Sequence, residues 1–313
     1  MSRQHLQRIR QPAGALFFVG AALLLLSGCA SLPPAPVGEA VQLANVPAFA
    51  QDDLQCGPAA LASVLSASGV ATTPETLTPD LFIPARKGSL QVELAAQSRL
   101  RERVPLPLAR DEQQLLIALQ QGQPVLVLLN LGVKSVPIWH YAALTGYDPA
   151  GGYTLNDGKA KPSLVPRARF LRQWNYAERW ALTLHAPAAP PSYAEPAPWI
   201  AAAAPLQRSA PAAAEQAYLA AVQRWPDSAL AWAALSESRY AAGDLATAAA
   251  HLRKATALAP GDAALTNNLA SVELERGCVT AARELLATVD VGRAEPAVAE
   301  ALLDLPRIDR PLE

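Results

Sequence analysis

The residues of this 313-residue chain that suggest covalent chemistry are three cysteines and four histidines. Cys56 stands in the stretch QDDLQCGPAALASVL, directly before Gly57 and Pro58. Proline suits the first turn of a helix and the apolar residues recur at helical spacing, so the pattern predicts a helix from Pro58 to Ser68. The positive end of a helix dipole favours a thiolate, and Gly57 would leave room for a substrate against the backbone. Cys56 is therefore a candidate nucleophile.

A cysteine nucleophile needs a base, normally a histidine, and a group that orients the base. His140 lies in the stretch PIWHYAALTGYD, which predicts a strand, and Asp157 ends the next predicted strand in YTLNDGK. A hairpin that joins these strands would bring the carboxylate of Asp157 beside the imidazole. The other interpretation is a core histidine, because His140 shares a strand face with Ala142 and Leu144.

The N-terminal segment ends in Leu26-Ser27-Gly28-Cys29, after a basic front and the apolar stretch AGALFFVGAALLLL. This arrangement resembles the bacterial lipobox, which implies a diacylated Cys29 and cleavage just before it; the alternative is a plain secretory signal. Ala30, rather than an aspartate, follows, as in lipoproteins sorted to the outer membrane of Gram-negative bacteria. We therefore expect residues 1–29 to be a lipoprotein signal peptide with its lipobox, and the protein to be a periplasm-facing, lipid-anchored one.

The remaining cysteines, Cys56 and Cys278, could pair in an oxidising compartment. They belong to segments that predict different domains, so a stabilising disulfide is the less favoured interpretation. Cys278 lies between two helical patterns and is typical of a small buried residue.

An α+β domain over residues 48–185 is predicted to position the candidate triad. A short tether over residues 30–47 precedes it, because that stretch has few large apolar residues. Helical patterns come first and strand patterns afterwards, which predicts an antiparallel meander. The predicted helices cover residues 58–68, 90–103 and 111–121, and the predicted strands cover residues 124–131, 138–148, 152–157 and 178–184.

Residues 186–211 are rich in Pro and Ala and predict an extended linker. Residues 212–305 then repeat with the 34-residue spacing of Pro226 and Pro260. This period resembles the tetratricopeptide repeat, an all-α solenoid that implies a protein partner; the alternative is an ordinary helical bundle. In this register the small or apolar residues of successive units align: Ala214 with Ala248, Tyr218 with Leu252, and Ala221 with Ala255.

The blocks QDDLQCGPAALASVL, WHYAALTGY and LND together resemble the papain-like peptidases that cut bacteriocin precursors after a double-glycine leader, and more closely their stand-alone exported relatives. The resemblance implies Cys56 as nucleophile, His140 as base and then acid, and Asp157 as the orienting carboxylate. It also implies Gln51 as oxyanion partner. That glutamine usually stands six residues before the cysteine and here stands five before it, so Gln55 is an alternative.

Asn156, next to Asp157, is an alternative orienting residue, because it could lie beside His140 if the strand register slips by one residue. No Gly-rich phosphate loop occurs in this chain, so the double-glycine substrate of transporter-fused members does not carry over. The balance of 26 Lys+Arg against 27 Asp+Glu indicates no nucleic-acid partner.

We therefore expect a lipoprotein thiol peptidase that needs no cofactor, acts on a protein or peptide and uses its repeats to bind a partner. A second hypothesis is a catalytically inactive, peptidase-like scaffold lipoprotein, because a fold does not guarantee activity. A third is acyl transfer to an acceptor other than water, as in an amidase or a transglutaminase, which the same triad would serve.

Overall fold

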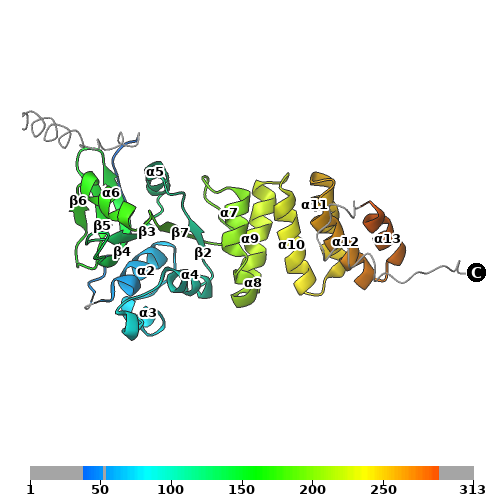
Figure 1. Cartoon of the computed structure of the whole chain (residues 1–313), viewed down its shortest axis with the longest axis horizontal. Coiled ribbons are helices and arrows are strands. Elements are labelled where there is room, and N and C mark those ends of the chain that lie inside the picture. The colour runs from blue at the N-terminus through cyan, green and yellow to red at the C-terminus, as the bar shows by residue number, and fades with distance from the viewer. Residues whose placement is uncertain (1–37, 52–53, 289–313) are drawn as a thin grey trace, which may run out of the picture. The chain divides into compact units, whose positions relative to one another are not determined.

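The computed structural model describes residues 38–51 and 54–288 (Figure 1). The predicted signal peptide and Cys29 lie outside the described residues. Within these ranges, no helix combines the length and the apolar character needed to cross a bilayer.

In the described part of the chain, seven strands form one antiparallel sheet (Figure 1). Their order is β2-β7-β3-β4-β5-β6, and β1 also pairs with β4. The strands are β1 (Val41–Gln42), β2 (Val104–Pro107), β3 (Val125–Asn130), β4 (Trp139–Asp148), β5 (Gly152–Asn156), β6 (Ser163–Val165) and β7 (Ala181–His185).

The predicted meander is correct for β3, β4 and β5 but wrong for the last strand. Helix α6 (Arg167–Tyr176) follows β6, and β7 then pairs with β3 instead of β5. The chain thus returns to the middle of the sheet, where β7 is buried along its whole length.

Helices cover both faces of this sheet. Tyr141 and Ala143 of β4 pack in one apolar cluster with α2 (Cys56–Ala67), α3 (Pro74–Leu81) and α4 (Gln91–Leu100). Ala142 and Leu144 pack on the opposite face with α5 (Glu112–Gln120) and α6. This alternation along β4 follows from the two-residue period of a strand, and it sandwiches the sheet between two helical layers.

The N-terminal segment is packed from residue 38 onward, so the predicted tether over residues 30–47 is wrong for its described part. Strand β1 pairs with β4, and the backbone N–H of Leu43 donates to the carbonyl of Thr145 at 2.9 Å. The side-chain amide of Asn156 donates to the carbonyl of Pro47 at 3.0 Å. The segment is held by hydrogen bonds to its backbone, and Val41 and Leu43 pack against the apolar cluster that contains α5 and α6.

Residues 186–211 do not form the extended linker that their composition predicts. They include α7 (Pro196–Ala203) and α8 (Leu206–Ser209). Trp199 of α7 is fully buried, and its indole N–H donates to the carbonyl of Ala217 at 3.0 Å. The same apolar cluster contains Val104 and Leu106 of β2, so this segment joins the sheet to the helices that follow.

The C-terminal region is helical, and its aligned positions are buried as the 34-residue period predicts. Ala214, Ala248 and Ala282 are each fully buried, because small residues let neighbouring helices approach closely. The helices are α9 (Pro211–Arg224), α10 (Ala229–Ala241), α11 (Leu245–Leu258), α12 (Ala263–Glu275) and α13 (Val279–Ala287). Cys278 precedes α13 and is partly exposed rather than buried.

Candidate active site

Cys56 is the first residue of α2, two positions earlier than the sequence predicts for the helix. It forms part of the wall of a cleft of about 680 Å³. Leu54, two residues before it, has a φ of 68°, in the left-handed region that is costly for a residue with a β-carbon. Cys56 is a free thiol, and the helix start holds it beside open space.

The thiol of Cys56 is mainly in its neutral form. Burial raises its pKa above the ordinary value of 9.0, although hydrogen bonds to the backbone of Tyr141 and Gly57 act in the opposite direction. The net shift of the pKa is upward at this helix start, because desolvation of the charged sulfur outweighs these hydrogen bonds. A sulfur nucleophile at this position would need a base to remove its proton.

Gly57 serves packing and leaves no room for a substrate. A β-carbon at this position would stand 2.5 Å from the hydroxyl oxygen of Ser89 and 2.7 Å from its β-carbon. Ser89 fills the space that the sequence analysis assigned to a substrate. Its hydroxyl is buried and has no hydrogen-bond partner in the described part of the chain.

His140 lies near the start of β4, opposite Leu129 of β3. Burial lowers the pKa of its imidazole, while the negative charge of Asp157 and a backbone hydrogen bond at that residue raise it. The nearby charge of Lys159 lowers it slightly. His140 is thus a mainly neutral imidazole whose protonated form is stabilised by Asp157, as a general base requires.

Asp157 follows directly after β5, and its carboxylate is shared with two other side chains. It accepts hydrogen bonds from the ammonium group of Lys159 at 2.7 Å and from the hydroxyl of Ser163 at 3.1 Å. The carboxylate therefore has a fixed position while its charge acts on His140. Asn156, the alternative orienting residue, uses its amide group to hold Pro47 instead.

The Cys56 thiol contacts the strand that carries His140, although His140 is not among the residues that line the cleft. The backbone of Tyr141, the residue after His140, forms the hydrogen bond with the Cys56 thiol. Within the described residues, no direct hydrogen bond joins the Cys56 sulfur to the His140 ring. Such bonds are often long in free enzymes and tighten when substrate binds.

The two candidate oxyanion residues have different surroundings. The backbone N–H of Gln51 donates to the carbonyl of Gly158 at 3.0 Å, and its side chain lies against Gly158. The side-chain oxygen of Gln51 is buried without a partner in the described structure. The side-chain oxygen of Gln55 instead accepts a hydrogen bond from the hydroxyl of Thr78 at 3.2 Å. Gln55 is therefore engaged with α3, whereas Gln51 lies beside the residue that follows Asp157.

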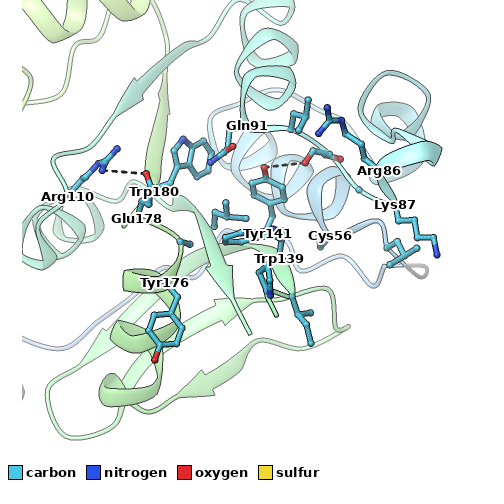
Figure 2. A pocket seen from close by; sticks show the side chains of 18 residues that line it. Cys56, Arg86, Lys87, Gln91, Arg110, Trp139, Tyr141, Tyr176, Glu178 and Trp180 are labelled. Carbon is cyan, nitrogen blue, oxygen red and sulfur yellow. Dashed lines mark hydrogen bonds and ion pairs between the residues drawn. The ribbon is translucent and has the colours of Figure 1, made fainter. Parts of the chain in front are cut away.

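Figure 2 shows the cleft, and its walls contain residues that the sequence analysis did not identify. They come from several separate segments of the chain, so no local spacing in the sequence marks them. Of these residues, only Trp139 and Tyr141 could have been predicted to line the site, because they flank His140 in the block WHY. The side chains labelled in the figure are Cys56, Arg86, Lys87, Gln91, Arg110, Trp139, Tyr141, Tyr176, Glu178 and Trp180.

Among the residues that the structure describes, no group of three or more His, Cys, Asp or Glu side chains is arranged to hold a metal ion. The chemistry that the described site supports is that of a thiol, an imidazole and a carboxylate.

Comparison with known proteins identifies two regions. Residues 43–182 match the model of the Peptidase_C39 like family, and residues 239–305 match that of the tetratricopeptide repeat. None of the curated proteins compared with the chain matches it. The first match covers the sheet with Cys56, His140 and Asp157, and the second begins within α10. The chain therefore contains a Peptidase_C39-like domain followed by a tetratricopeptide-repeat region.

Proposed function

We propose that the protein is a cell-envelope cysteine peptidase that hydrolyses peptide bonds with Cys56, His140 and Asp157. The observation that carries this proposal is the contact between the Cys56 thiol and the backbone of Tyr141 at the wall of the cleft. It joins the start of α2 to the residue after His140, and Asp157 acts electrostatically on that histidine. Together these two interactions support placing a nucleophile, a base and an orienting carboxylate in one site.

In the first half of the reaction, His140 removes the proton of the Cys56 thiol as the sulfur attacks the substrate carbonyl carbon. A carbon–sulfur bond forms, and the carbonyl oxygen becomes an oxyanion. The backbone N–H of Cys56 and the side-chain amide of Gln51 stabilise that charge. When the oxyanion collapses, the carbon–nitrogen bond breaks and the imidazolium of His140 protonates the leaving amine.

In the second half, water hydrolyses the thioester. His140, now neutral, takes a proton from the water as its oxygen attacks the same carbon. The carbon–sulfur bond breaks, the carboxylic acid product leaves, and the sulfur regains its proton from His140. The negative charge of Asp157 favours the imidazolium that forms in both halves.

The proposal extends to the ends of the chain. Cys29 carries the lipid anchor that holds the protein in the outer membrane, facing the periplasm, and the lipobox-like residues 26–29 support this. The repeats bind a protein partner, which the tetratricopeptide match supports. The enzyme is a stand-alone exported relative of the bacteriocin-processing peptidases, and its substrate is not a double-glycine leader.

The test is the rate at which a thiol-directed electrophile labels Cys56 in protein without residues 1–29. We expect a peptide-like electrophile to label the wild type faster than a free thiol, because the cleft aligns it with the sulfur. We expect His140→Ala to slow this labelling by roughly 10²-fold or more, since base catalysis contributes about that much. Cys278 is a matched control, because it is a partly exposed thiol far from His140 in the sequence.

A different result would favour the scaffold hypothesis. The raised pKa of Cys56 is the observation that favours it, because a binding domain has no need of a reactive thiol. If Cys56 reacts no faster than Cys278 and the His140→Ala substitution leaves its rate unchanged, the peptidase proposal is wrong.

The oxyanion assignment is tested separately, by comparing Gln51→Ala with Gln55→Ala. We expect Gln51→Ala to lower kcat by about 10²-fold, which is typical for loss of one oxyanion donor. Gln55→Ala is the matched control, because its side-chain oxygen is engaged by Thr78, and it should lower kcat less than about tenfold. The reverse order of effects would assign the role to Gln55.

A further inference from the structure

The cleft beside Cys56 has more positive than negative charge along its walls. Arg86, Lys87 and Arg110 line it, and Glu178 is the one carboxylate among its lining residues. Glu178 forms an ion pair with Arg110 at 3.8 Å. Neither Arg86 nor Lys87 has an ion-pair partner within the described part of the chain. These two exposed cations are therefore available to a bound molecule.

A tight turn holds both cations in place. The backbone N–H of Ile83 donates to the carbonyl of Gly88 at 2.9 Å, and the N–H of Lys87 donates to the carbonyl of Pro84 at 3.1 Å. Lys87 has a left-handed φ of 52°. These hydrogen bonds fix the backbone of Arg86 and Lys87 and therefore the positions from which their side chains extend. We call these two residues the basic corner of the cleft.

The opposite part of the cleft is aromatic. Trp180 packs edge-on against Tyr141 with ring centroids 5.9 Å apart, and Tyr176 also lines this part. Trp139 and Ile138 line the cleft while 54% and 58% exposed, respectively. We call Trp139, Tyr176 and Trp180 the aromatic wall. Exposed side chains of this kind gain free energy when an apolar group covers them.

Cys56 lies between these two regions. In Figure 2 the basic corner is at one end of the cleft, and Trp180 and Tyr176 of the aromatic wall are at the other. Cys56 and Tyr141 are between these ends, and Trp139 is the member of the aromatic wall that lies beside them. A peptide whose carbonyl carbon meets the sulfur would thus extend toward the cations on one side and toward the aromatic rings on the other.

Resting on the peptidase function proposed above, we propose a substrate class for this site. The substrate is a peptide with an acidic side chain on one side of the scissile bond and an aromatic or large aliphatic side chain on the other. The acidic side chain pairs with Arg86 and Lys87, and the apolar one packs on the aromatic wall. Charge complementarity at the basic corner selects between peptides that the apolar contact alone would accept.

The test uses short fluorogenic peptides in which one position is Glu, Gln or Lys and the other is Phe or Gly, in both orders. We expect the wild type to cleave the Glu/Phe peptide with a kcat/KM roughly tenfold above that of the Gln/Phe peptide. Added salt should reduce this preference, because it screens exposed charges. Replacing Phe by Gly should also lower kcat/KM.

Charge reversal of the basic corner supplies the decisive variant. In Arg86→Glu/Lys87→Glu we expect the preference to invert, so that the Lys/Phe peptide becomes the better substrate. Lys254→Glu is the matched control, because this exposed cation of α11 is remote in the sequence from every cleft residue. It should retain the wild-type preference. Cleavage that is indifferent to the charge of the peptide would overturn the inference and leave the peptidase function intact.

If no peptide is cleaved, a binding measurement distinguishes failure of the proposed substrate class from failure of the proposed peptidase function. In Cys56→Ala, fluorescence anisotropy measures peptide binding without turnover. Tighter binding of Glu/Phe than of Lys/Phe, lost on reversal of the basic corner, would support the ligand class while the peptidase function fails. Absence of binding by every peptide would overturn the inference as well.

Discussion

The described site has a neutral thiol and a neutral imidazole in the free protein. Burial raises the pKa of Cys56 and lowers that of His140, so desolvation disfavours the charged form of both groups. An ion pair of thiolate and imidazolium would have to overcome both effects. In the proposed reaction the proton would therefore move during attack, and the charge of Asp157 would matter most when the imidazolium forms.

Two substitutions next to His140 should move its pKa in opposite directions. Asp157→Asn removes a negative charge that stabilises the imidazolium, so the pKa should fall further. Lys159→Gln removes a positive charge and releases the carboxylate that Lys159 holds at 2.7 Å, so the pKa should rise. NMR titration of the histidine ring protons measures both shifts, and the chain has only four histidines to assign.

The same shifts should appear in catalysis. The acidic limb of the kcat/KM profile reports protonation of the base in the free enzyme. It should move to lower pH in Asp157→Asn and to higher pH in Lys159→Gln. Lys161→Gln is a matched control, because Lys161 does not contribute to the pKa of His140. Shifts of the same sign in both variants would contradict the arrangement described here.

At the scale of single residues, the sequence predicted the features that depend on local patterns. Cys56 lies just before Pro58 at a helix start, and His140 and Asp157 lie in successive strand patterns, so local patterns were enough to select them as candidates. Arg86, Tyr176 and Trp180 could not be assigned to the cleft, because they come from a turn, the end of α6 and the loop before β7. Only the tertiary fold brings these segments together.

At the scale of elements, β7 ends in a buried polar group. His185 is 3% exposed, and its ring nitrogen Nε2 lies 2.7 Å from the hydroxyl of Thr183. The hydroxyl of Tyr193 lies 3.3 Å from the same nitrogen and donates to Thr183 at 3.1 Å. Burial lowers the pKa of His185 to about 4, so the folded protein keeps it neutral.

This residue should make stability depend on pH. Its pKa is 6.5 when unperturbed and about 4 in the fold, so between these values the unfolded state binds a proton that the folded state does not. The free energy of unfolding should therefore fall as the pH falls from 6.5 to about 4, and be unaffected by His185 above 6.5. The total loss should be roughly 3 kcal/mol. Urea unfolding at a series of pH values measures it.

The control is His185→Gln, which keeps a polar side chain but cannot titrate. Other groups contribute equally to both proteins, so the difference between the two curves isolates His185. An equally steep loss of stability in the variant would show that a different group is responsible.

The elements that the sequence analysis missed share a physical cause. Strand β2 has the sequence VPLP, in which the prolines disguise the strand pattern. Helix α7 has the sequence PAPWIAAA, whose composition is typical of a linker. Its burial depends on Trp199 packing against residues far away in the sequence, which no local pattern reports. The strongly periodic helices and strands, such as α5 and β3, were predicted to within one residue at each end.

At the scale of the whole molecule, one apolar cluster joins the sheet to the helices that follow it. Val104 and Leu106 of β2 belong to the same cluster as Trp199 of α7 and Leu235 of α10. Part of the core of the Peptidase_C39-like domain, at β2, is therefore completed by helices outside that domain. It depends on helices that the sequence suggested were separate.

Truncation should reveal this dependence. A fragment of residues 38–185 would expose Val104 and Leu106, so we expect it to aggregate or to melt at a lower temperature than a fragment of residues 38–242. The longer fragment keeps α7 to α10 and thus every member of the cluster. Thermal unfolding and size-exclusion chromatography measure both properties.

A third fragment distinguishes the shared cluster from a simple effect of length. Residues 38–211 end at the boundary that the sequence predicted, and they retain α7 and α8 but lose the carbonyl of Ala217 that binds Trp199. This fragment should also be unstable. Full stability of residues 38–185 or 38–211 would contradict a shared core.

The packing of residue 41 against β4 has a consequence for where a membrane-anchored enzyme could work. If Cys29 carries the proposed lipid, residues 30–37 are all that separates the acyl chains from the folded part that the structure describes. Eight residues extend at most about 30 Å, whatever their conformation. The lipid would then hold residue 38 within about 30 Å of the bilayer surface, so a substrate would have to approach that surface to be cut.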